Sequence, residues 1–247
     1  MELILHGAAG RMGQTVLALI KRRADLTVVC AVDPACRDMG AVASLPRCPI
    51  SADCVIDFSH HSATPSLLSY CRRTHTPVVI GTTGHTAGEL NLIYRAAETL
   101  PVFHSSNLSV GIALLTDLVR RTARLFPEAD IEIIETHHSQ KPDTPSGTAK
   151  MLATAIEQVL PRQSLLGRRC GRQSRQELGI HAIRRGELPG IHEVIFTTAC
   201  QSITLRHEVH CRQLYAEGAL AAAAFLMGRP PGFYDMKDLM KCSESEL

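Results

Sequence analysis

The first hundred residues alternate between short continuous apolar runs and stretches with apolar residues at helical spacing. The continuous runs lie at residues 2–6, 26–32, 54–58, 78–80 and 101–104. The helical spacing falls between them, after residue 13 and over about 64–73 and 87–99. Continuous apolar strands separated by helices are typical of a parallel sheet that is covered on both faces. The pattern therefore predicts an α/β fold with a Rossmann-like doubly wound parallel sheet.

The pattern changes after Asn107. A longer amphipathic helix is expected over 110–125, and the expected strands that follow, at 131–134, 179–184, 193–198 and 203–207, mostly lack helices between them. This favours a smaller α+β domain with a mixed or antiparallel sheet, one face of which could contact other subunits. An Ala-rich helix over 215–227 is expected to return to the first domain. We therefore predict a discontinuous first domain, residues 1–108 and 217–247, around a second domain of residues 109–216.

Composition and charge argue against several classes of function. The 247 residues carry 26 Lys and Arg against 24 Asp and Glu, a net charge of +2. The basic residues at 168–175 read as a loop, and nothing predicts nucleic acid as a partner. The longest apolar run, 219–227, is too short to cross a membrane, and the chain begins on a strand without a signal-peptide pattern, so a soluble cytoplasmic protein is expected. Nine cysteines without a CxxC pair indicate reduced thiols, and no metal site is predicted.

A glycine turn follows the first strand. Residues 7–13 read GAAGRMG and lead into a helix, an arrangement similar to a dinucleotide-binding fingerprint, although the glycines are three residues apart and do not fit GxGxxG. Asp33 ends the second strand, where an acidic residue would bind ribose hydroxyls. The alternative for Asp33 is a turn residue before Pro34.

Two further turns are expected at the carboxyl edge of the parallel sheet, where ligands bind in doubly wound folds. They are Gly81-Thr82-Thr83-Gly84 and Ser105-Ser106-Asn107. Taken alone, the first of them is better interpreted as an ordinary tight turn.

The densest group of polar residues is the segment Glu135 to Lys150, called here the cassette. The strand before it should deliver His137, His138 and Lys141 onto a loop. Ser146 is expected to cap a helix that starts near Gly147, and a helix start beside a glycine is a ready anion site. The predicted ligand is a carboxylate or phosphate. The alternative is that the histidines only end a strand and Ser146 only caps a helix.

Together these segments resemble the 4-hydroxy-tetrahydrodipicolinate reductase family, whose members act in diaminopimelate and lysine biosynthesis. The resemblance covers nearly the whole chain and rests on GAAGRMG at 7–13, GTTG at 81–84, SSNLSVG at 105–111, EIIETHHSQKPDTPSGTA at 132–149, GIHEV at 190–194 and the tail GFYDMKDLM. It implies an NADH- or NADPH-dependent oxidoreductase that reduces a cyclic dicarboxylate with loss of water. It also implies a homotetramer whose two domains close on binding.

The resemblance implies a role for individual residues. His137 and Lys141 would donate protons, while His138, Ser146, Gly147 and Thr148 would bind a substrate carboxylate. The residues that would bind the cofactor are Gly7, Ala8, Ala9, Gly10, Arg11, Met12, Asp33, Gly81, Thr82, Thr83, Ser105, Ser106, Asn107 and Leu108.

Some residues depart from the family pattern. Ala9 replaces a common glycine, Pro34 follows the acidic residue where members that favour the 2'-phosphate often carry Arg, and Ser139 and Gln140 are unusual within the cassette. We therefore expect NADH to be used at least as well as NADPH, although Arg11 or Arg37 could contact a 2'-phosphate. The alternatives are another two-domain NAD(P)-dependent amino-acid dehydrogenase and a non-enzymatic NAD-responsive binding protein.

Overall fold

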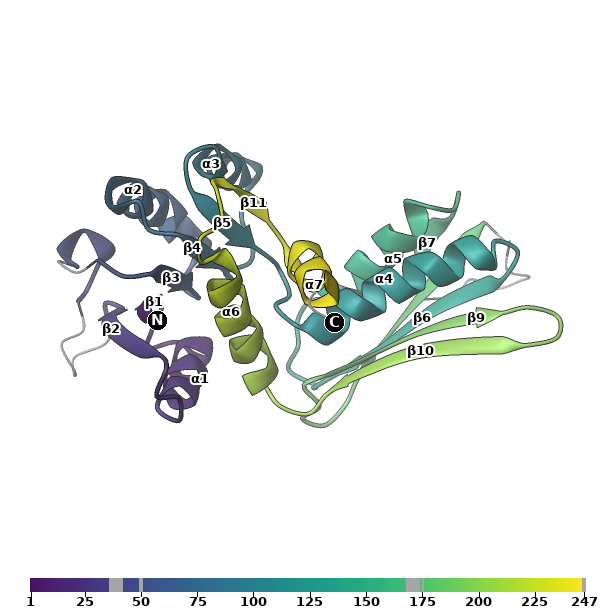
Figure 1. Cartoon of the computed structure of the whole chain (residues 1–247). Coiled ribbons are helices and arrows are strands. Elements are labelled where there is room, and N and C mark those ends of the chain that lie inside the picture. The colour runs from purple at the N-terminus through teal and green to yellow at the C-terminus, as the bar shows by residue number, and fades with distance from the viewer. Residues whose placement is uncertain (36–41, 49–50, 168–173, 175, 246–247) are drawn as a thin grey trace. The chain divides into compact units, whose positions relative to one another are not determined.

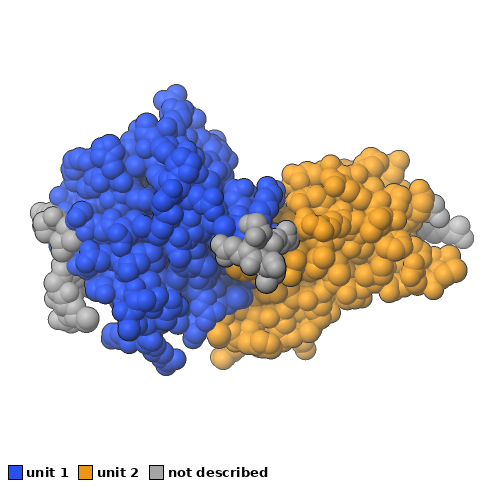
Figure 2. Space-filling view, in the orientation of Figure 1, with its two compact units in different colours: residues 1–109, 212–247 blue, residues 110–211 orange. Residues whose placement is uncertain are grey.

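A computed structural model describes residues 1–35, 42–48, 51–167, 174 and 176–245 (Figure 1). The chain divides into two compact units, one of residues Met1–Ser109 and Arg212–Leu247 and one of Val110–Cys211 (Figure 2). The first unit is thus built from two separate segments, and its second segment begins at Arg212 where the sequence pattern suggested residue 217. No helix in the described part of the chain is long and apolar enough to cross a membrane.

Unit 1 is a parallel sheet with helices packed against it. The strand order is β11-β5-β4-β3-β1-β2, with bounds β1 Glu2–His6, β2 Thr27–Val32, β3 Cys54–Asp57, β4 Val78–Ile80, β5 Pro101–His104 and β11 Gly232–Tyr234. The helices are α1 Arg11–Ile20, α2 Thr64–Thr74, α3 Ala87–Ala97, α6 Gln213–Leu226 and α7 Met236–Ser245. Helix α6 packs across β3, β4 and β5 beside α1, while α2 packs against α3. The predicted doubly wound α/β fold is confirmed.

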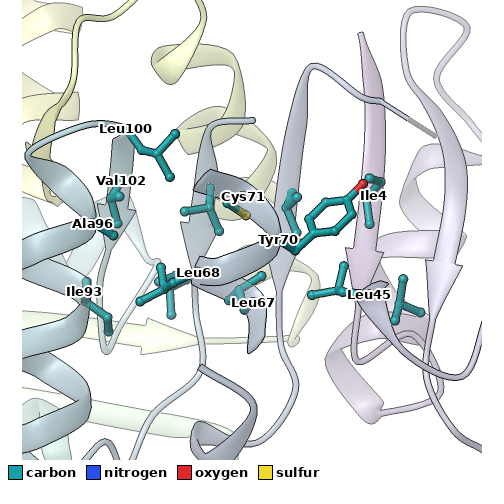
Figure 3. Packing of buried hydrophobic residues seen from close by; sticks show 14 of the residues in the cluster. Ile4, Leu45, Leu67, Leu68, Tyr70, Cys71, Ile93, Ala96, Leu100 and Val102 are labelled. Carbon is teal, nitrogen blue, oxygen red and sulfur yellow. The ribbon is translucent and has the colours of Figure 1, made fainter. Parts of the chain in front are cut away.

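One part of the core of unit 1 lies between the sheet and helices α2 and α3 (Figure 3), and the other lies between the sheet and helices α1 and α6. Ile4, Val55 and Val78 contribute from the strands, and Leu67 and Ile93 from the two helices, all fully buried. Each such side chain stabilises the fold by about 1.5–3 kcal/mol relative to exposure. This packing fixes the carboxyl ends of the strands, from which the candidate cofactor turns project.

Unit 2 is a mixed five-stranded sheet with two helices. The strand order is β10-β9-β6-β8-β7, with bounds β6 Asp130–His137, β7 Gln163–Leu166, β8 Glu177–Arg184, β9 Gly190–Thr197 and β10 Ser202–Val209. Strand β6 runs parallel to β8 and antiparallel to β9. Helices α4 Val110–Leu125 and α5 Gly147–Glu157 pack against each other and share the unit's core with the sheet. The predicted mixed sheet is confirmed.

One local prediction differs from the structure, and three local features were not predicted. Strand β6 continues through His137, so this histidine is the last residue of the strand and not part of the following loop. The short strands β7 and β11 were not predicted; β11 has only three residues and is held by its pairing with β5. Helix α5 ends at Glu157 although apolar residues continue to Leu160. The basic residues 168–173 and 175 lie outside the described residues.

Candidate functional site

The carboxyl end of β6 places Glu135 and His137 on the same side of the sheet, because alternate residues of a strand share a face. Both side chains are buried, with exposed fractions of 0% for Glu135 and 8% for His137. Oε2 of Glu135 lies 3.1 Å from Nδ1 of His137. A buried carboxylate therefore faces the first histidine of the cassette.

Glu135 is also held at its other oxygen. Oε1 accepts hydrogen bonds from the backbone N–H of Ser146 at 3.0 Å and from Nη2 of Arg184 at 3.0 Å. Burial by itself raises the pKa of Glu135, but hydrogen bonds from His137, Ser146 and Arg184 outweigh it and hold the pKa well below its usual range. Glu135 is therefore ionised at neutral pH and accepts hydrogen bonds only.

His192 belongs to the same cluster. It lies opposite Glu135 in the β6–β9 pairing, and its Nε2 atom is 3.1 Å from Oγ of Ser146 and 3.8 Å from Oε2 of Glu135. Burial, with a smaller contribution from His137, lowers the pKa of His192 to about 3. The ring is thus neutral at pH 7 and has one N–H to donate.

Helix α5 begins beside this cluster. Ser146 caps it as predicted, since its Oγ accepts the backbone N–H of Ala149 at 3.2 Å. Gly147 is exposed, and a Cβ built on it would have no atom within 4 Å, so open space lies in front of the first turn. Thr148 is partly buried in the same turn. A helix start with open space and a positive dipole end can take an anion.

Lys141 and His138 lie on the loop that follows β6. The loop turns back on itself, with the N–H of Lys141 donating to the carbonyl of His138 at 3.1 Å. Nζ of Lys141 pairs with Oδ1 of Asp143 at 2.8 Å. Partial burial raises the pKa of Asp143, but the hydrogen bond and charge of Lys141 outweigh burial and lower it. The lysine of the cassette therefore forms an ion pair with Asp143.

Glu135, His137 and His192 also have the residue types of a metal site, with one potential ligand atom from each lying within 4.8 Å of the others. The cation already present at this carboxylate is Arg184, which donates to Glu135 at 3.0 Å. Because a second cation would be repelled there, the arrangement favours a hydrogen-bonded cluster.

In unit 1 the glycine turn packs closely against neighbouring backbone. Gly7 has φ +83, and a Cβ there would lie 2.5 Å from the carbonyl oxygen of Phe58. A Cβ on Gly13 would overlap the carbonyl of Gly7, so α1 can pack this closely only on a glycine. Between them, Gly10 donates its N–H to the carbonyl of Gly7 at 3.1 Å. The turn thus has the close backbone packing of a dinucleotide-binding turn, despite its departure from GxGxxG.

The other residues predicted for this turn lie at its edge. Ala8 is buried, Met12 is partly buried and Arg11 is exposed at the start of α1. Asp33 follows β2 and accepts the N–H of Ala9 at 3.1 Å and of Ala35 at 2.9 Å. Asp33 therefore lies against the glycine turn, where its remaining lone pairs can accept ribose hydroxyls. Arg37 lies outside the described residues.

The two carboxyl-edge turns contact each other. A Cβ on Gly81 would lie 2.8 Å from Cδ1 of Leu108, so the second turn packs directly on the first. Thr82 is buried and donates to Oδ2 of Asp57 at 2.6 Å, while Thr83 is exposed. Ser105 donates its hydroxyl to the carbonyl of Asn107 at 2.7 Å, and Ser106 is exposed. The structure thus brings the predicted segments 81–83 and 105–108 together.

Four residues of these clusters were not predicted: Glu135, Arg184 and His192 in unit 2, and Asp57 in unit 1. Asp57 is buried and accepts hydrogen bonds from Thr82 and from Ser59 at 2.6 Å, and its Oδ1 atom lies 2.7 Å from Nδ1 of His6, so it contacts residues at the ends of three strands. A sequence signal existed for Glu135, since a charged residue alternating with His137 in an otherwise apolar strand indicates a shared polar face. Arg184 and His192 reach the cluster only through sheet pairing, which a local pattern does not reveal.

Family models match both halves of the chain. The model described as "Dihydrodipicolinate reductase, N-terminus" matches residues 1–108, and the model described as "Dihydrodipicolinate reductase, C-terminus" matches residues 111–240. A 4-hydroxy-tetrahydrodipicolinate reductase of Caldanaerobacter subterraneus subsp. tengcongensis is 42% identical over 98% of each chain. One from Clostridium tetani is 37% identical over 96% of this chain and 95% of its own.

Solved structures show the same fold. A dipicolinate-bound dihydrodipicolinate reductase from Paenisporosarcina sp. TG-14 has a TM-score of 0.75 at 24% identity, over 95% of this chain and 97% of its own. An aspartate dehydrogenase from Thermotoga maritima has a TM-score of 0.52 at 12% identity, over 93% of this chain and 97% of its own, and thus shares the architecture alone. Two family models that together span nearly the whole sequence, and relatives above 30% identity over full length, lead to one conclusion: this chain belongs to the dihydrodipicolinate reductase family.

Proposed function

We propose that this chain reduces 4-hydroxy-tetrahydrodipicolinate to tetrahydrodipicolinate, with NADH or NADPH as the reductant. In the balanced reaction the substrate, one NAD(P)H and one proton give the product, NAD(P)+ and one water. Membership of the reductase family supports this activity. The alternative of an aspartate-type dehydrogenase has only the shared fold in its favour.

Unit 1 is proposed to hold the dinucleotide. Gly7, Gly10 and the start of α1 would take the pyrophosphate, Asp33 a ribose, and the turns at Gly81–Thr83 and Ser105–Leu108 the nicotinamide half. When bound, a reduced nicotinamide supplies the hydride. The chain's own contribution in unit 1 is to bind and orient the cofactor, and the positive φ at Gly7 supports that role.

Unit 2 is proposed to bind the dicarboxylate and to deliver a proton. The first turn of α5, with Ser146, Gly147 and Thr148, would receive one carboxylate, and His138 on the neighbouring loop would add a donor. The Paenisporosarcina reductase is bound to dipicolinate, itself a dicarboxylate, which supports a ligand of this class. Reduction leaves an electron-rich enamine that must be protonated, and His137 and Lys141 are the proposed donors.

The observation that carries the proposal is the position of Glu135. This buried carboxylate contacts both His137, a proposed proton donor, and the backbone of Ser146, at the proposed carboxylate site. A chain with only a regulatory role would not require a histidine paired with a buried carboxylate beside an anion site.

The test is a reductase assay with substrate made in situ from pyruvate and aspartate semialdehyde by a condensing synthase, run separately with NADH and NADPH. We expect substrate-dependent oxidation of at least one cofactor. The matched control is the Lys141→Ala variant, which should bind cofactor but oxidise it slowly. Wild-type protein that binds a cofactor yet oxidises neither would overturn the proposal.

We also propose that the protein works as a cytoplasmic homotetramer assembled through unit 2. Exposed apolar side chains on strands β7 and β8, Leu166 at 65% and Ile183 at 44%, support an interface on that unit. The nine cysteines without a CxxC pair support a reducing compartment. Light scattering coupled to size-exclusion chromatography tests the assembly, and a monomeric mass would contradict it.

A further inference from the structure

The hydroxyl of Ser146 lies between two potential hydrogen-bond partners. Its oxygen accepts the backbone N–H of Ala149 at 3.2 Å and lies 3.1 Å from Nε2 of His192. Ser146 is 2% exposed and His192 is 3% exposed, so water cannot readily replace either partner. Which of the two side chains donates to the other depends on where the proton of His192 resides.

The surroundings of His192 place that proton on Nε2. Its Nδ1 atom is buried and has no hydrogen-bond partner among the described residues. A proton on Nδ1 would leave a buried donor without an acceptor, which costs more free energy than an unfilled acceptor position. A proton on Nε2 instead points at Oγ of Ser146 and toward the negative Oε2 of Glu135, 3.8 Å away. Burial keeps the ring neutral, since it lowers the pKa of His192 to about 3.

This tautomer fixes the role of the Ser146 hydroxyl. With Ala149 and His192 both donating to it, both lone pairs of the oxygen are filled, and its own hydrogen can only be donated. The acceptor is the carboxylate of Glu135, because a hydrogen bond from the Ser146 side chain, besides the one from the Ser146 backbone N–H at 3.0 Å, is among the causes that lower the pKa of Glu135. The hydroxyl thereby holds the start of α5 against Glu135.

We propose that His192 is a positioning residue for substrate binding, which donates from Nε2 to Ser146 and thereby directs the Ser146 hydroxyl to Glu135, so that the start of α5 is held where its backbone N–H groups can receive the substrate carboxylate. The inference rests on the proposed function, because it concerns the dicarboxylate site of unit 2. It adds a residue that would never touch the substrate and would act only through Ser146.

The test compares two substitutions of His192. In His192→Gln the side-chain amide nitrogen can take the place of Nε2 and still donate, whereas His192→Leu fills the space without a donor. Isothermal titration with dipicolinate should show binding weakened about 10- to 100-fold in His192→Leu, and largely restored in His192→Gln. In the reductase assay, KM should rise in His192→Leu more than kcat falls, because the lost interaction is present in both ground and transition states.

A second comparison separates positioning from packing. His207 faces His192 across the β9–β10 pairing and also has an Nδ1 atom without a partner among the described residues, so His207→Leu removes a neighbouring imidazole that does not contact Ser146. It should leave dipicolinate binding unchanged. Ser146→Ala should lose as much binding as His192→Leu, and the double variant should lose little more than either. NADH binding, followed by its fluorescence, should be the same in all of them.

Three results would overturn the proposal: equal weakening in His192→Gln and His192→Leu, additive losses in the double variant, or a stoichiometric metal ion in the purified protein. A metal on His192 would require an unprotonated Nε2. These outcomes differ from failure of the proposed function, in which the wild-type protein itself would bind no dipicolinate and reduce no substrate.

Discussion

Glu135 and His137 face each other on one side of β6, with 3.1 Å between Oε2 of the carboxylate and Nδ1 of the imidazole. Because the carboxylate is ionised, the contact is favourable only when Nδ1 carries a proton. The other nitrogen, Nε2, lies against Gly190, where a Cβ would come within 3.0 Å of it. Glu135 on the same strand thus orients Nδ1 of His137. Gly190 on the neighbouring strand β9 leaves room for Nε2.

The first prediction concerns the charge of Glu135. Its pKa is lower in the folded protein than in the unfolded chain, where it is about 4.3. Its stabilising effect is therefore fully present above the unfolded value and is lost as the pH falls from there through the folded value. Glu135→Gln should lower the free energy of unfolding by about 3–5 kcal/mol at pH 7, since it leaves the largely buried Arg184 without its charged partner.

Urea unfolding at pH 7 and at pH 3.5 measures this effect. The difference between wild type and Glu135→Gln should shrink at the lower pH, where the carboxylate of the unfolded wild-type chain takes up a proton. Glu132→Gln is the control, because Glu132 is 27% exposed and pairs with His181 at 2.7 Å. It should cost less than about 1 kcal/mol at either pH. An equal cost for the two variants would mean that the charge of Glu135 has no special role.

The second prediction concerns Lys141. If it delivers the proton, Lys141→Ala should lower kcat by about 10²–10⁴-fold at saturating substrate. Lys141→Arg keeps the charge and can still pair with Asp143, but an arginine hardly releases a proton, so kcat should stay low. Steady-state kinetics at saturating NADH distinguishes a proton donor from a residue that only binds the substrate's negative charge. An arginine variant with most of the wild-type kcat would make Lys141 an anion anchor only.

His137→Ala should resemble Lys141→Ala, and the double variant should lose far less than the product of the two effects, because groups that serve one step are not additive. Asp143→Asn is a useful comparison. It removes the carboxylate 2.8 Å from Nζ of Lys141 but leaves the lysine in place, so it should change kcat much less than Lys141→Ala. A multiplicative double variant would assign the two residues to separate steps.

The third prediction concerns the choice of cofactor. Asp33 already accepts two backbone N–H groups and remains beside the glycine turn, so it can accept ribose hydroxyls but would repel a 2'-phosphate of about −1.5 to −2 charge. NADH should be used at least as well as NADPH, and Asp33→Ser should shift the ratio toward NADPH. The ratio of kcat/KM for NADH to kcat/KM for NADPH measures this preference in the wild type and in the variant. A wild-type preference for NADPH beyond tenfold, about 1.4 kcal/mol, would mean that Arg11 or Arg37 overrides Asp33.

Local signals in the sequence predicted the parts of the molecule that are set locally. Ser146 was identified as an N-cap from its place before an apolar helical repeat, and the structure confirms its hydrogen bond to Ala149. The strands of the parallel sheet were found because burial on both faces makes them continuously apolar. Strand β11 was missed because its three residues become a strand only by pairing with β5.

The buried polar clusters were harder to predict because they are assembled by strand register. His192 comes opposite Glu135 only when β9 pairs with β6 in one particular alignment, and Arg184 arrives from β8 on the other side. In the sequence Asp57 has no feature beyond its place at the end of a strand. Only the folded structure brings β1, β3 and the Thr82 turn together around it. Sequence spacing carries no information about such register, whereas the residues proposed to bind a ligand from loops and helix starts lie close together along the chain.

The last prediction uses Gly147, which the structure leaves without any atom within 4 Å of an added Cβ. Ala is favoured over Gly in a helix, and the backbone of Gly147 is not in the left-handed region, so Gly147→Ala should keep or slightly raise the melting temperature. If a carboxylate approaches the N–H groups of this turn, however, the added methyl group occupies its space, and dipicolinate should bind at least about tenfold more weakly, a loss of about 1.4 kcal/mol.

Gly88→Ala is the matched control: Gly88 lies in the first turn of α3, and its added Cβ would meet only Thr86 Oγ1 at 3.9 Å. That variant should gain the same small stability and bind dipicolinate as wild type does. Calorimetric melting measures the stability of both variants, and calorimetric titration measures their affinity for dipicolinate. If Gly147→Ala binds dipicolinate as tightly as wild type does, the start of α5 is not part of the substrate site.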